Sequence, residues 1–97
     1  MNDDRAKLRR ADALLRNGEH EDAARIYAEV GCLFRRQGLL LKAVAVWKQV
    51  HELLHREAFV PSDLGAEARG ELIALYRELG LEADARAIEM ELQRELH

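Results

Sequence analysis

Three glycines in this protein are each followed, five residues later, by an alanine, and this spacing restricts the fold more than any other feature. Glycine closes a helix cheaply because it adopts the left-handed conformation without a steric cost. An alanine in the next helix lets two helices approach closely, and a large side chain one turn later fills the space beyond. The residues are Gly18, Ala23 and Tyr27; Gly38, Ala43 and Trp47; and Gly80 and Ala85, with Ile88 near the third place. The pattern predicts stacked helical hairpins.

Apolar residues at intervals of three or four predict five helices. The clearest stripes flank Gly38, with Val30 and Phe34 before it and Trp47 after it. The predicted ranges are about 5–17, 21–36, 40–57, 64–79 and 82–96. Pro61 interrupts the rhythm because a helix cannot continue through it. No run alternates in the manner of a strand. We expect an all-α fold of five antiparallel helices, in a single domain over residues 1–97.

The charged residues are unevenly distributed along the sequence. The net charge is −3, but residues 1–56 carry 11 Lys and Arg against 8 Asp and Glu, whereas residues 57–97 carry 4 against 10. Halves of opposite charge attract one another, within a molecule or between copies, so a homo-oligomer is one expectation. Neither half is basic enough to indicate nucleic acid as a partner.

The cysteine content and the hydropathy bear on the compartment. The single cysteine, Cys32, cannot form an internal disulfide and fits a reducing environment, and its small apolar side chain predicts burial. No signal peptide precedes the first predicted helix, and no stretch is long and apolar enough to span a membrane. We therefore expect a cytoplasmic protein without membrane insertion.

Residues 24–57 resemble a unit of the tetratricopeptide repeat (TPR) family, which pairs two antiparallel helices in about 34 residues. The matching positions are Val30, Gly31, Phe34, Gly38, Ala43 and Trp47. Residues 66–97 match less completely, through Leu72, Tyr76, Gly80 and Ala85, and the first helix supplies a half-repeat. The proline that usually closes a repeat is absent, and residues 58–65 are an insertion. The resemblance implies an α-solenoid of about two and a half repeats, in a bacterial protein that binds other proteins.

Four residues are candidates for contact with a partner. Arg25, Arg35 and Arg36 lie on the second predicted helix, which the resemblance implies would line a concave groove. Arginine suits carboxylates, so an acidic segment or the carboxyl terminus of another protein is one expected ligand, and compensation of the helix dipole is the alternative. Phe59 lies in the predicted loop, where it could either dock a partner or pack beneath the loop.

Residues 51–55 read HELLH and match the signature of zinc-dependent hydrolases. On a helix, His51 and His55 would share one face and Glu52 would act as general base, with Glu71 or Glu78 as a third ligand. The same helix must bury its apolar face, which competes with metal binding. We therefore expect a chance match, with no catalytic residue, cofactor or metal. A metal site at the two histidines is the alternative.

The expected function is that of a non-catalytic protein–protein interaction module, an adaptor or scaffold that binds a segment of another protein in a helical groove. Two alternatives stay open. One is a small zinc-dependent hydrolase built on residues 51–55. The other is a TPR-type chaperone or regulator that masks an apolar segment of its partner, through a groove lined by apolar rather than arginine side chains.

Overall fold

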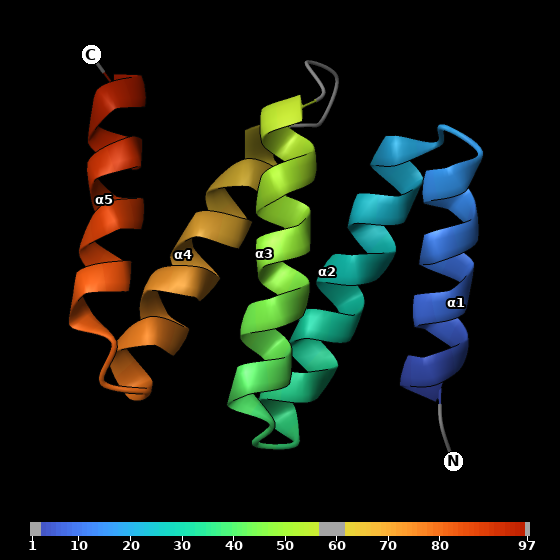
Figure 1. Cartoon of the computed structure of the whole chain (residues 1–97), viewed down its shortest axis with the longest axis horizontal. Helices are drawn as coiled ribbons and strands as arrows, with labels where there is room; N and C mark the ends of the chain where they lie inside the picture. Colours follow the sequence, from blue (N-terminus) through green and yellow to red (C-terminus); the bar gives the residue numbers. More distant parts are fainter. Residues whose placement is uncertain (1–2, 57–61, 97) are drawn as a thin grey trace.

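A computed structural model describes residues 3–56 and 62–96 of the protein, with side chains over 4–53 and 63–94, and shows five α-helices (Figure 1). They are α1 (Asp3–Arg16), α2 (His20–Arg36), α3 (Leu40–Arg56), α4 (Ser62–Glu78) and α5 (Glu82–Leu96). No strand occurs within the described ranges. The predicted all-α class and the five helices are confirmed. Helix α4 begins two residues before its predicted start at 64.

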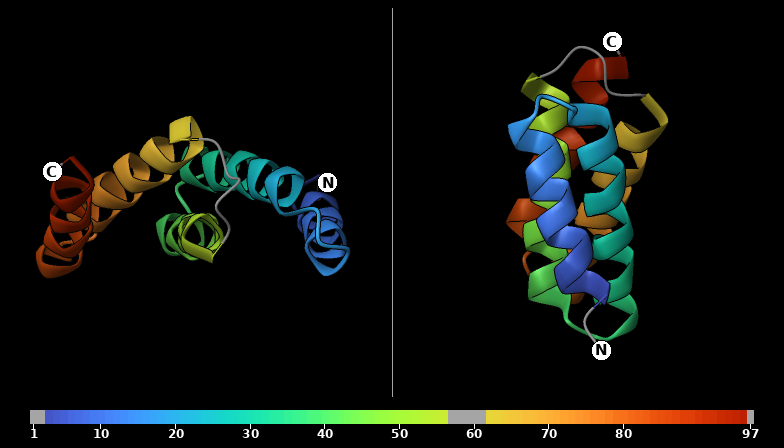
Figure 2. Two further views of the ribbon diagram at one scale, coloured as in Figure 1. Left: turned by 90° about the horizontal axis from the view of Figure 1, so that it is seen from above. Right: turned by 90° about the vertical axis from the view of Figure 1, so that its right-hand side faces the viewer.

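The helices lie side by side in the order of the sequence, and each packs chiefly against its neighbours in sequence. Seen from above, α2 and α4 lie on one side of α3, and α1 and α5 occupy the two ends (Figure 2). The principal axes measure 35 × 31 × 17 Å, so the assembly is a slab that is thin in one direction. That these helices form the repeats of a solenoid stays a prediction.

Three of the connections are built in the same way, as the glycine spacing predicts. Gly18, Gly38 and Gly80 have φ angles of +81°, +77° and +76°. In each turn, the N–H of the residue after glycine donates to a carbonyl five residues back, as from Leu39 to Phe34 at 2.9 Å. These bonds satisfy carbonyls that the end of a helix would leave free. The following alanines are fully buried, which allows the close packing of successive helices.

The centre of the core lies between α2 and α3. Trp47 is fully buried there, and its indole ring lies directly over Gly31 of α2. A Cβ atom at Gly31 would stand 2.5 Å from the indole Nε1, so only glycine leaves enough room. Val30 and Val50 are also fully buried, and Tyr76 extends the core into α4.

Candidate functional site

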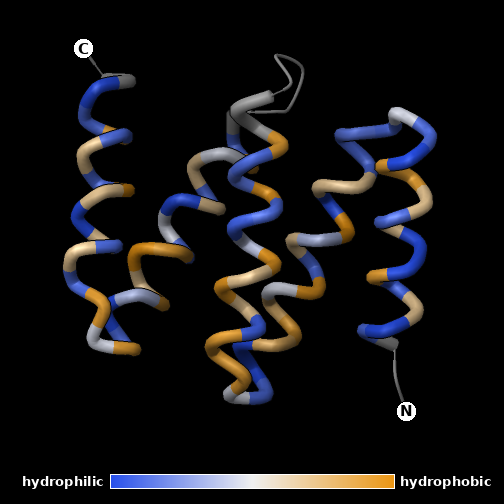
Figure 3. Tube along the Cα trace, in the orientation of Figure 1, coloured by the Kyte–Doolittle hydropathy of each residue, from blue (hydrophilic) through white to orange (hydrophobic). Residues whose placement is uncertain are grey.

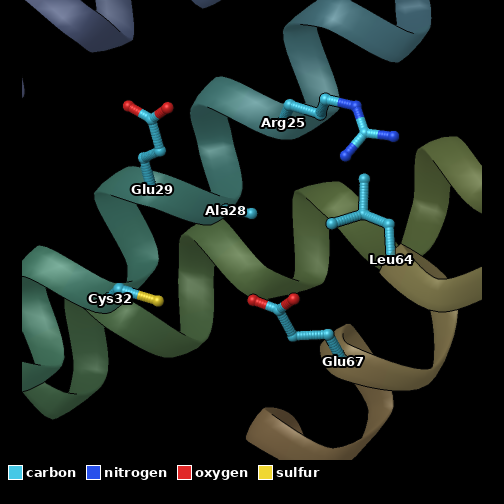
Figure 4. A pocket seen from close by; sticks show the side chains of 6 residues that line it. All are labelled: Arg25, Ala28, Glu29, Cys32, Leu64 and Glu67. Carbon is cyan, nitrogen blue, oxygen red and sulfur yellow. The ribbon is translucent and has the colours of Figure 1, made fainter.

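An open hollow of about 270 Å³ lies between α2 and α4. Its lining residues are Arg25, Ala28, Glu29, Cys32, Leu64 and Glu67 (Figure 4). The sequence places them one helical turn apart, at 25, 28–29 and 32 on α2 and at 64 and 67 on α4, so that each helix presents one face to the hollow. We call this space the α2–α4 groove.

The charged residues of the α2–α4 groove differ in how they are paired. Arg25 lies 3.7 Å from Glu21, one turn earlier on α2, and Glu29 binds Lys7 of α1 at 2.9 Å. Glu67 makes no ion pair within the described part of the protein. In Figure 4, its carboxylate and the sulfur of Cys32 point into the same space between the two helices. The groove therefore contains one carboxylate whose charge no described neighbouring cation offsets directly.

Cys32 reports on the electrostatic environment of the groove. It is half-buried rather than buried as the sequence predicts, because it lies on the groove-facing side of α2. Burial raises the pKa of its thiol, and the charges of Glu67 and Glu71 raise it further against the weaker influence of Arg36 and Arg35. The thiol is therefore held in its protonated form, which is a poor nucleophile.

The structure separates the three candidate arginines. Arg35 binds Glu71 at 2.6 Å and Glu78 at 2.9 Å, so it joins α2 to α4. Arg36 is exposed and lines a second hollow of about 300 Å³ on the side of α1, which shares Glu29 and Cys32 with the groove. Arg25 alone among the three lines the α2–α4 groove. Phe59 lies outside the described residues. The part of these residues in partner binding stays a prediction.

The residues of the HELLH stretch lie in α3, and His51 contacts α5. The Nε2 atom of His51 is 2.8 Å from a carboxylate oxygen of Glu91, and the imidazole is largely buried. Glu52 is exposed, while Glu71 and Glu78, the expected third ligands, bind Arg35 instead. The side chain of His55 lies outside the described set. Among the side chains that are described, no group of three or more His, Cys, Asp or Glu is placed to hold a metal ion.

Sequence reasoning missed an exposed group of leucines at one end of the molecule. Leu41 is 70% exposed, Leu39 38% and Leu81 40%. Leu39 and Leu41 line a hollow of about 410 Å³ together with Leu79 of α4, and we call these three residues the leucine cluster. Figure 3 shows apolar segments at the α2–α3 and α4–α5 turns, at the same end of the slab. The run of leucines at 39–41 is the signal, because successive residues point about 100° apart on a helix and cannot all face inward.

Comparisons with protein-family models, with curated proteins and with solved structures gave no match. The resemblance to tetratricopeptide repeats therefore stays a prediction based on the residues quoted above. Within the described residues, no helix combines the length and the apolar character needed to cross a bilayer.

Proposed function

We propose that this protein is a non-catalytic protein–protein interaction module that holds a segment of a partner protein in the α2–α4 groove. The observation that carries the proposal is the open hollow of about 270 Å³ between two helices, whose apolar lining residues are buried or half-buried and whose charged lining residues are exposed. Binding sites commonly combine these two kinds of lining.

The way the two helices are held supports this assignment. Arg35 ties α2 to α4 through Glu71 and Glu78. Both helices also bury apolar side chains against α3, among them Val30 and Leu72. A groove formed by helices that are already fixed loses little conformational entropy when a ligand enters. This arrangement suits an adaptor or scaffold, because no binding free energy is lost in ordering the site.

The test uses Cys32 as a reporter, since it is the only cysteine and lines the groove. Peptides selected from a displayed random library for binding to the protein should slow the alkylation of Cys32. The reaction is run at alkaline pH because the thiol has a raised pKa. Arg25→Ala should change the affinity for the same peptides, whereas Gln93→Ala, an exposed change on α5, should not. Selected peptides that leave the alkylation rate unchanged would place binding elsewhere and refute the proposal.

The leucine cluster favours a second candidate function, in which the protein masks an apolar segment of its partner. Leu41 is far more exposed than most large apolar side chains in a folded domain. If this function holds, the selected peptides are rich in apolar residues and lose binding to Leu41→Lys. Met90, which is 56% exposed on α5, offers the matched control Met90→Lys. If the selected peptides are polar and bind Leu41→Lys as tightly as the parent protein, this candidate is ruled out.

A further inference from the structure

We propose that the segment held in the α2–α4 groove is cationic, with a lysine or arginine side chain that lies along the groove floor and ends at Glu67. This inference rests on the proposed function and specifies the chemistry of the partner. It differs from the expectation of an acidic ligand that the arginines alone suggest.

Three of the four cations near the groove, Lys7, Arg25 and Arg35, already have partners, and the fourth, Arg36, lines the neighbouring hollow. Arg35 is shared by two carboxylates, at 2.6 and 2.9 Å. Lys7 binds Glu29, and Arg25 is near Glu21. An acidic ligand would have to compete with these internal carboxylates for each of the three paired cations. A cationic ligand needs no such exchange, because Glu67 makes no ion pair within the described residues.

The charges on this face are not balanced. Five carboxylates surround the line between α2 and α4, at positions 21, 29, 67, 71 and 78, and they face cations at positions 7, 25, 35 and 36. The pKa of Cys32 also indicates net negative charge. The carboxylates of Glu67 and Glu71 raise it more than Arg35 and Arg36 lower it. The charges bordering the groove therefore sum to a net negative value, which favours positive side chains.

The shape of the groove also fits a long side chain with an apolar stem. The least exposed lining residues are Ala28, Cys32 and Leu64, whose side chains are small or aliphatic, and they form the groove floor. Lysine and arginine have long methylene stems that bury well on apolar surfaces while the charged end remains in water. The methylene stem would pack on Ala28 and Leu64, and the charged end would pair with the carboxylate of Glu67. A short acidic side chain would leave the floor uncovered and bring two carboxylates together.

The experiment uses three synthetic peptides that differ only in charge. A peptide of about ten residues spans roughly 35 Å when extended, which equals the longest axis of the molecule at 35 Å. Lysine, glutamate or glutamine alternates with alanine in the three versions. Each is titrated into the isotopically labelled full-length protein, and backbone NMR shifts are followed. We expect the lysine peptide to shift resonances of residues 25–32 and 64–67, and to do so more weakly as salt is added.

Two variants with the same change in net charge separate the groove from general attraction. Glu67→Gln and Gln93→Lys each make the protein more positive by one unit, but Gln93 is exposed on α5, away from the groove. We expect Glu67→Gln to weaken the lysine peptide by roughly two- to fivefold, the range that exposed ion pairs give. Gln93→Lys should change the affinity for the lysine peptide little, because salt screens charges that lie far apart.

The outcomes distinguish this inference from the proposed function. If the glutamate or glutamine peptide shifts the groove resonances and the lysine peptide does not, the groove binds peptides but the cationic assignment is wrong. Equal weakening by Glu67→Gln and Gln93→Lys would also overturn it, because the attraction would then be non-specific. If none of the three peptides, nor any peptide selected from the library, reaches the groove, both proposals fail.

Discussion

One close contact in the core joins two residues with no charge and no reactive group. Gly31 lies beneath the indole of Trp47, and the nearest indole atoms are 2.5, 2.8 and 2.9 Å from the place of an added Cβ. We expect Gly31→Ala to lower the free energy of unfolding by roughly 1–2 kcal/mol, because overpacking a rigid core costs more than the helix propensity of alanine returns.

Gly70 provides the matched control for this substitution. It also lies inside a helix, but a Cβ there would meet nothing within 4 Å. Gly70→Ala should therefore stabilise the protein by about 0.5–1 kcal/mol. Urea denaturation of the two variants measures both effects. Equal changes in the two variants would mean that the close approach of Trp47 to α2 does not restrict position 31.

Tyr27 links stability to pH at the α1–α2 contact. Its phenol donates a hydrogen bond to Asp12, and burial together with this carboxylate raises its pKa well above the ordinary value. Since the folded-state pKa exceeds the unfolded one, the contribution is complete below about pH 10 and is lost as the pH rises towards the folded-state pKa. Tyr27→Phe should flatten the decline of unfolding free energy above pH 10, by up to about 1.4 kcal/mol per pH unit. Parallel pH profiles of variant and parent would contradict this.

Among the helices, the connection of α2 to α4 depends on one arginine of an adjacent pair. Arg35 carries two ion pairs to α4, whereas Arg36 is exposed and makes no ion pair within the described residues. We expect Arg35→Met to cost about 0.5–1 kcal/mol, since both pairs are partly open to solvent. Arg36→Met should change stability by less than about 0.5 kcal/mol. Thermal unfolding at low and high salt provides the measurement, and only the Arg35 effect should shrink with salt.

The sequence predicted the helices well because their signals are local. The glycine turns and the apolar spacing placed all five to within about two residues at most ends. It did not predict how Arg35 and Arg36 would differ, although they are neighbours. Their roles depend on Glu71 and Glu78, 36 and 43 residues further on, and no local pattern encodes such a distant pairing. The same holds for His51, whose partner Glu91 belongs to another helix.

The whole molecule is held together mainly by contacts between successive helices, and this predicts a gradient of stability. Helices α2, α3 and α4 have a neighbour on both sides, and the most extensive packing is between α2 and α3, whereas α1 and α5 stand at the ends of the slab (Figure 1). Local opening costs less where fewer buried contacts must be broken. We expect amide hydrogen exchange to be slowest in α2 and α3 and fastest in α1 and α5. Equal protection in all five helices would indicate a single cooperative unit instead.

Because Trp47 is buried, its fluorescence reports on one part of the molecule only. It is the only tryptophan of the protein, and it is fully enclosed between α2 and α3. Its fluorescence therefore changes when α2 and α3 separate, and it does not change when only α1 or α5 unfolds. Circular dichroism counts all helices equally. If the unfolding midpoints from fluorescence and from circular dichroism differ, the end helices unfold before α2 and α3 separate. The difference between the two midpoints then measures this effect.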